Sequence, residues 1–276
     1  MKFRYGIGGA AVLAALSLTV ASVAWADDGA AVEPLGFSSD GRTFAFEQYG
    51  TESVSGMDYS LTDVIAVATN RSVDGVPLVV DTTTVDDSLL QDPNQDPLLV
   101  IRRQAKQQAA PLLQRFGING SGTRVGIVAA SRSRETTLAI ADETDGRQSP
   151  VVKALQQAAV ATMALEPSVF GGGAHMELQE QAIASSAGTC ADYGYTAKGF
   201  TLTLQRDGKP PLVLGAVQAA QTDEGCPLGF GLAEAHALQL ADGSIALAVL
   251  VQRFEYVMEG PDRRFTVVTA LVKRGE

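Results

Sequence analysis

The stretch LGFSSDGRTFAFEQYG, residues 35–50, indicates what kind of fold this chain adopts. An apolar start leads into a polar Ser-Ser-Asp-Gly turn, and residues 43–47 then alternate phenylalanine with smaller or polar side chains. An Asp-Gly pair between two such segments is a strong signal for a β-hairpin. The pattern is also typical of one edge of a β-propeller blade, so the first question is whether it repeats.

The blade-like pattern occurs once. A propeller needs repeats of roughly 40–50 residues and usually at least four blades, and nothing in this chain recurs at a fixed period. We therefore reject a propeller and expect a single blade-like antiparallel meander over residues 27–85. Its predicted strands are residues 35–37, 43–49, 62–68 and 76–80, with residues 50–60 as a loop.

An acidic loop and one prominent helix follow over residues 86–117. Asp96 is a good N-cap and Pro97 suits the first helical position. Apolar residues then recur at helical spacing. Pro111 should end or kink this helix near Ala110, and Gly117 is a natural stop.

Residues 118–276 are predicted to form a β-rich body. After an expected loop at 119–122, the apolar runs are separated by explicit Asp-Gly and Gly-Pro-Asp turns, the last at 260–262. Residues 151–165 fit a helix or a strand. The fold class is therefore mainly β (β-rich α+β), with a sandwich- or barrel-like antiparallel sheet in this half. The predicted strands are residues 124–130, 136–141, 175–183, 200–206, 212–217, 235–240, 245–256 and 265–273.

The first 26 residues are predicted to be a secretory signal peptide. Lys2 and Arg4 precede a run rich in small apolar residues, which closes on Ala-Trp-Ala. Cleavage there would make Asp27 the mature N-terminus and leave one secreted domain, residues 27–276. The alternative is an uncleaved anchor. The leader has a bacterial character, so we expect a periplasmic or secreted protein with no stable membrane insertion after cleavage.

The charge of the chain argues against nucleic acid as a partner. The full sequence carries 21 basic and 31 acidic residues, and loss of the leader would remove two of the basic ones. A strongly acidic protein is repelled by phosphate backbones and anionic membranes. The expected partner is an envelope protein or a small ligand.

Cys190 and Cys226 are the only cysteines. In an oxidising compartment an even pair is most simply a disulfide. A zinc site would need more ligands than the two cysteines and two distant histidines supply, and the C-x-x-C of a redox pair is absent. We expect no metal.

The segment FEYVMEGPDRRF gathers the strongest candidates for chemistry. Glu259 and Asp262 are candidate catalytic carboxylates, while Arg263 and Arg264 could clamp a carboxylate or phosphate. The alternative is a turn braced by an Asp–Arg pair. Asp40 and Glu47 are secondary binding candidates.

The helix also has a candidate binding surface. Its basic residues, Arg102, Arg103, Lys106 and Arg115, are expected on an outer face, either paired with acidic neighbours or docking an acidic partner. Other motifs fail, since the calcium-like DPNQD lacks its later ligands, the glycines at 117–122 lack the phosphate-loop lysine, and His175 and His236 lie in no hydrolase motif. No cofactor is predicted.

The segments LGFSSDGRTFAFEQYG, AKGFTLTL and EGPDRRFTVVTALV together resemble a bacterial family of predicted secreted proteins of unknown function. The resemblance spans about residues 35–272 and implies secretion and a whole-chain domain, but no reaction. The first segment is also similar to the propeller repeats of the Tol translocation system. A non-catalytic binding or envelope accessory protein is therefore the leading hypothesis, and an envelope hydrolase using Glu259 and Asp262 is the alternative.

Overall fold

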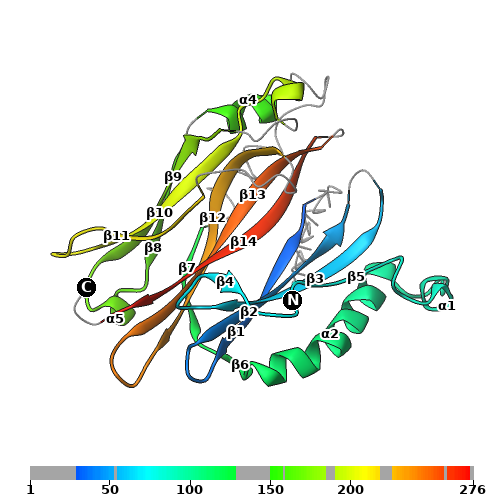
Figure 1. Cartoon of the computed structure of the whole chain (residues 1–276), viewed down its shortest axis with the longest axis horizontal. Helices are drawn as coiled ribbons and strands as arrows, with labels where there is room; N and C mark the ends of the chain where they lie inside the picture. The colour runs from blue at the N-terminus through cyan, green and yellow to red at the C-terminus, as the bar shows by residue number, and fades with distance from the viewer. Residues whose placement is uncertain are drawn as a thin grey trace, which may run out of the picture.

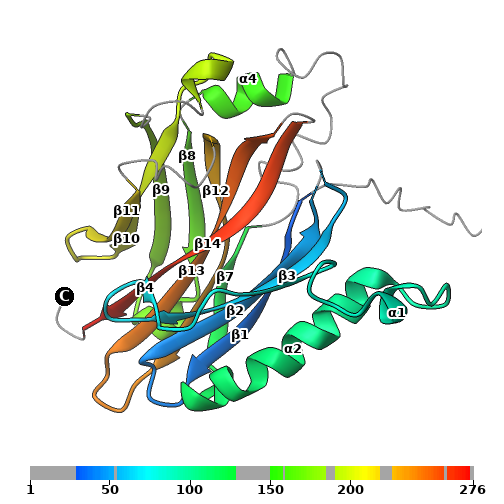
Figure 2. The ribbon, with the colours of Figure 1, turned by 45° about the vertical axis from the view of Figure 1, so that its right-hand side comes forward.

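A computed structural model describes residues 29–52, 55–128, 150–157, 159–184, 190–217, 226–257 and 260–273. The described chain is mostly β, as predicted, and its strands form three open antiparallel sheets. The three sheets form successive layers, and one long helix covers the outer face of the first sheet (Figures 1 and 2). Several predictions lie outside the described residues: the signal peptide, Asp27, the strand at 136–141, and Glu259.

The first sheet has the strand order β4-β3-β2-β1-β6, and β5 also pairs with β3. The hairpin predicted from the opening segment is confirmed: β1 and β2 are antiparallel, and β2 continues into β3 as a meander. Asp40 accepts hydrogen bonds from the Ser38 hydroxyl (2.7 Å) and the Arg42 amide (3.1 Å), which fixes the turn. The strands are β1 (Ala31–Ser38), β2 (Thr43–Thr51), β3 (Asp58–Ala66), β4 (Arg71–Ser72), β5 (Leu78–Asp81) and β6 (Ile118–Ser121).

The loop predicted at residues 119–122 is wrong, because most of it is β6. Strand β1 offers a free edge, and Ser121 pairs there with Phe37. At Gly122, whose φ is +97°, the chain leaves the first sheet and enters the second of the three sheets, the middle sheet described below. A Cβ at this position would lie 2.7 Å from the Phe37 ring, so only glycine fits the crossing.

The middle sheet has the order β14-β13-β12-β7, and the third sheet has the order β11-β10-β9-β8. The turn predicted at residues 260–262 is wrong, since β14 already begins at Gly260. Pro261 is tolerated there because β14 is an edge strand, where a missing N–H costs no ladder bond. The strands are β7 (Thr123–Ile127), β12 (Cys226–Gln239), β13 (Ile245–Val257), β14 (Gly260–Val272), β8 (Val160–Leu165), β9 (Ala174–Ala182), β10 (Lys198–Arg206) and β11 (Leu212–Val217).

Strand β13 is buried on both faces, which explains its uninterrupted apolar run at residues 245–251. Ala246, Ala248 and Leu250 pack against the phenylalanines of the first sheet. Leu247 and Val249 join the larger core shared with the third sheet. One strand thus supplies both cores, and the sandwich alternative is the one observed.

Helix α2 (Pro97–Arg115) begins as predicted, with the Asp96 carboxylate accepting from the Leu98 amide. Of the two outcomes predicted at Pro111, an end or a kink near Ala110, the end is wrong, because the helix continues to Arg115. Pro111 and Gln107, whose carbonyl loses a helical donor, are both exposed, so water can satisfy that carbonyl. The other helices are short: α1 (Asp87–Leu90), α4 (Pro150–Gln156), α5 (Pro167–Phe170) and the 3-10 turn η2 (Ala191–Tyr193).

The ambiguous segment at 151–165 contains both alternatives, since α4 ends at Gln156 and β8 begins at Val160. The predicted disulfide is confirmed. Cys190 and Cys226 are bonded, with 36 residues of sequence separation, beside the buried Leu155 and Phe254. Closing a loop of this length stabilises the fold by roughly 3–4 kcal/mol in the chain-entropy model.

Candidate functional site

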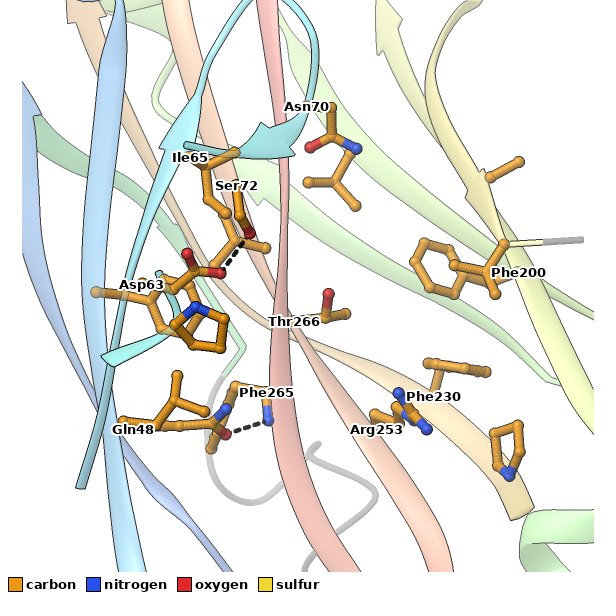
Figure 3. Close-up of a pocket in the computed structure, with 18 residues that line it drawn as sticks. Gln48, Asp63, Ile65, Asn70, Ser72, Phe200, Phe230, Arg253, Phe265 and Thr266 are labelled. Carbon is orange, nitrogen blue, oxygen red and sulfur yellow. Dashed lines mark hydrogen bonds between the residues drawn. The ribbon is translucent and has the colours of Figure 1, made fainter. Parts of the chain in front are cut away.

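A cleft of about 470 Å³ follows the outer edge of β14. The first sheet forms one wall and the third sheet the other, with β14 running between them (Figure 3). Ligand pockets typically have volumes of this order. The cleft exists because the middle sheet stops at β14 while both neighbouring sheets extend past it.

Two side-chain amides cap the backbone of this edge. The Phe265 amide donates to Gln48 Oε1 (3.0 Å), and the Thr269 amide donates to Asn70 Oδ1 (2.7 Å). Along a strand the backbone N–H and C=O groups point alternately to one side and the other. Val267 lies midway between Phe265 and Thr269, so it also points its N–H and C=O away from β13. Among the described residues nothing pairs with Val267 on that side. The edge is therefore closed at two points and open between them.

Asp63 lies on the first-sheet wall of the cleft (Figure 3). Its carboxylate accepts from the Ser72 hydroxyl (2.9 Å) and the Val64 amide (2.7 Å). Burial raises the pKa of Asp63, although both hydrogen bonds act to lower it. No lysine or arginine of the described chain forms an ion pair with it. Its negative charge therefore lacks a cationic partner within the described structure.

The opposite wall is mainly apolar. Phe200 and Phe230 lie there, on the other side of β14 from Asp63 (Figure 3). Val217, on β11 of the third sheet, also lines the cleft. Arg253 is on this side as well, but its Nε is 2.8 Å from Glu255 Oε1. Arg253 already has a carboxylate beside it, whereas Asp63 has no cation beside it among the described residues.

The candidates from the C-terminal segment form structural contacts. Asp262, only 5% exposed, lies 2.8 Å from Arg264, two residues along β14. Arg264 also covers the ring of Tyr59, 4.5 Å from its centroid, where burial raises the tyrosine pKa to about 12. Arg263 donates from Nε to the Ala30 carbonyl (3.0 Å). The Asp–Arg brace is thus observed, on a strand instead of a turn.

Glu47 lies on the outer face of the first sheet, under α2, and is 1% exposed. Arg102 donates to it from Nε (3.0 Å) and from a terminal nitrogen (2.9 Å), and Ser60 adds a hydroxyl bond (2.9 Å). The guanidinium also stacks over Tyr49, 3.4 Å from the ring centroid. The hydrogen bonds that Arg102 donates to Glu47 are the main cause of the raised pKa of Arg102.

The outer basic face predicted for α2 is only partly observed. Arg102, with a side chain 16% exposed, points into the sheet, and Lys106 lies 3.1 Å from Glu33. Burial acts to raise the pKa of Glu33, but the contacts with Lys106 and Arg102 outweigh it and lower that pKa. Arg102 and Lys106 turn toward the sheet because its acidic residues Glu33 and Glu47 lie there. Arg103 and Arg115 are exposed.

Apart from Asp262 and Arg264, the sequence candidates within the described ranges lie apart from one another. Asp40 stays in the exposed β1–β2 turn, where the bond from the Ser38 hydroxyl lowers its pKa. Glu47 and Asp262 are each held by an arginine in a different layer. Within the described ranges no group of three or more histidine, cysteine or acidic residues is arranged to hold a metal.

Comparison with family models places the chain in a family. The model described as "Predicted secreted protein (DUF2259)" matches residues 45–271, so the chain belongs to this family of predicted secreted proteins of unknown function. Searches of the curated proteins and of the solved structures found no match. No helix among the described residues is long and apolar enough to cross a membrane.

Proposed function

We propose that this protein is a secreted, non-catalytic binding protein whose ligand occupies the cleft along β14. The observation that supports the proposal is the Asp63 carboxylate, which is partly buried in the cleft wall with neutral hydrogen-bond donors only. A partly buried charge without a counter-charge is costly, and a ligand cation would offset that cost. Membership of a secreted family agrees with an extracytoplasmic ligand, and we propose leader cleavage and a periplasmic or external location on the same grounds.

Binding is favoured over hydrolysis by the state of the carboxylates. General acid–base catalysis needs a carboxyl group that can reach a substrate and exchange protons with it. Asp262 is buried beside Arg264, and Glu47 is buried beneath Arg102. Among the carboxylates singled out from the sequence, the hydrolase alternative therefore depends chiefly on Glu259, and turnover lost in Glu259→Gln would revive it.

The test is a native mass spectrum of the full, disulfide-bonded protein purified gently from the envelope and medium of its producing cells. We expect an added mass that survives gentle desolvation. The same spectrum of Ala216→Trp should lack it, because Ala216 is an exposed residue of the cleft wall. Val213→Trp is the matched control, since Val213 is exposed on the same strand but outside the cleft. An added mass that Ala216→Trp retains, or a bare wild-type protein that also selects no peptide in the experiment below, would refute a ligand in this cleft.

A further inference from the structure

The open part of the β14 edge defines the kind of ligand that the cleft accepts. We propose, building on the function proposed above, that the cleft binds an extended basic polypeptide segment, which adds to β14 as a short further strand. Peptide addition to a sheet edge takes its affinity from main-chain hydrogen bonds and its specificity from alternate side chains. Both elements are present along β14.

The backbone contribution comes from Val267. In an antiparallel ladder one residue can exchange both N–H···O bonds with the residue opposite it. The caps at Phe265 and Thr269 block the amides on either side. A peptide residue opposite Val267 therefore gains two hydrogen bonds, while longer pairing would require Gln48 or Asn70 to move away.

The side-chain contribution follows from the pleat. Residues that form a hydrogen-bonded pair project their side chains to the same face of a sheet. The Val267 side chain packs with the first-sheet core, so its peptide partner also faces the first sheet. Asp63 lies on that wall, so the partner residue is a lysine or arginine.

The residues before and after this cation face the other way, toward the third sheet. Phe200 and Val217 line that wall, and Val268 projects toward it. Apolar side chains fit there. The recognised pattern is thus apolar–basic–apolar in an extended conformation. The negative charge of the whole chain, −10, also favours a basic partner through its long-range attraction.

The experiment is selection from a phage-displayed library of random heptapeptides on the immobilised wild-type protein. We expect enrichment of lysine or arginine at one position between apolar residues. A synthetic peptide from that pool should bind Asp63→Asn about 10- to 100-fold more weakly, as befits a lost charged hydrogen bond. The same peptide N-methylated at the basic residue should lose about tenfold in affinity for the wild type, without any change to the protein.

Two proline variants test the backbone pairing. Val267→Pro removes the outward N–H but no bond to β13, and Leu271→Pro makes the same change on the same edge outside the cleft. Only the first should weaken the peptide, by about tenfold. No enrichment, or peptides indifferent to Asp63→Asn and to N-methylation, would overturn the proposal.

Other occupants would give distinct results. A small amine in the native spectrum, lost in Ala216→Trp, with no peptide selected, would keep the proposed binding function and refute the peptide. A dimer abolished by Val267→Pro would show a second copy of the chain on the edge, and would likewise overturn the proposal. A bare protein that selects no peptide would refute both.

Discussion

Strands β2 and β3 carry one carboxylate on each face of the first sheet, Glu47 fully buried and Asp63 partly buried, and the two differ in what surrounds them. On the outer face Glu47 has Arg102, Lys106 and Ser60. On the inner face Asp63 has only a hydroxyl and a backbone amide. The sheet is the same and the strands are adjacent, so the difference lies in the layer that each face meets.

The outer face meets a helix of the same chain, and the inner face meets an open cleft. A carboxylate whose counter-charge is supplied internally has a structural role. A carboxylate with no counter-charge among the described residues is available to a ligand, as proposed above for Asp63. The same substitution made at Glu47 and at Asp63, measured in the same assay, can therefore distinguish a structural carboxylate from one available to a ligand.

The largest effect is expected for Arg102→Met. It leaves Glu47 almost fully buried with only the more distant Lys106, 3.6 Å away, as a cation. Removing one partner of a buried ion pair costs about 3–5 kcal/mol. Urea unfolding should show a loss of this size. Arg103→Met, an exposed change on the same helix, should stay within about 0.5 kcal/mol of the wild type.

The double variant Arg102→Met with Glu47→Gln shows whether the unpaired charge is the cause. It should be more stable than Arg102→Met alone, because the stranded negative charge is gone. If the double variant is the less stable of the two, the stranded charge is not the cause of the loss, and the remaining contacts of Glu47 with Lys106 and Ser60 are stabilising.

A matched pair of amide substitutions gives a smaller and sharper contrast. Glu47→Gln should destabilise the protein by about 1.5–3 kcal/mol, since hydrogen bonds to charged groups contribute that much. Asp63→Asn should remain within about 1 kcal/mol of the wild type, because it removes a charge with no cation beside it. Equal losses at both positions in the same urea assay would remove the distinction between the two faces.

The smallest effect is the pH dependence at Asp63. Burial raises its pKa in the folded protein above the ordinary value of 3.8, so the ionised form disfavours folding. That cost is present above the folded pKa and disappears as the pH falls toward 3.8. The stability of Asp63→Asn relative to the wild type should therefore decrease between pH 7 and pH 4. An increase over that range would show that the charge is paired in solution.

The local elements were predictable where one physical signal dominated. Alternation of Phe200, Leu202 and Leu204 marked β10, and Asp96 before Pro97 marked the start of α2. Predictions failed where a distant partner decided the outcome. Ser121 became part of a strand because β1 offered an edge. Pro261 entered a strand because β14 had no outer neighbour.

The cleft could not be read from the sequence, because its contacts join distant segments. Gln48 contacts Phe265, 217 residues away in the sequence, and Asn70 contacts Thr269, 199 residues away. One local signal existed. Asp63 sits between Leu61 and Ile65 on a strand face that is otherwise apolar, and a lone carboxylate there indicates burial. The charged C-terminal cluster was a more visible signal and led to structural arginines.

The two amide caps on β14 also bear on how the protein behaves at high concentration. A sheet edge that is open along its length is a template for other chains and leads to fibres. Here the Ala30 amide occupies the Arg263 carbonyl, and Gln48 and Asn70 occupy two amides further along. Between the two amide caps, the open part of the edge is recessed between two walls and is too short to nucleate a growing ribbon. We therefore expect the side chains of Gln48 and Asn70, which limit pairing along this edge, to reduce aggregation of the protein as well.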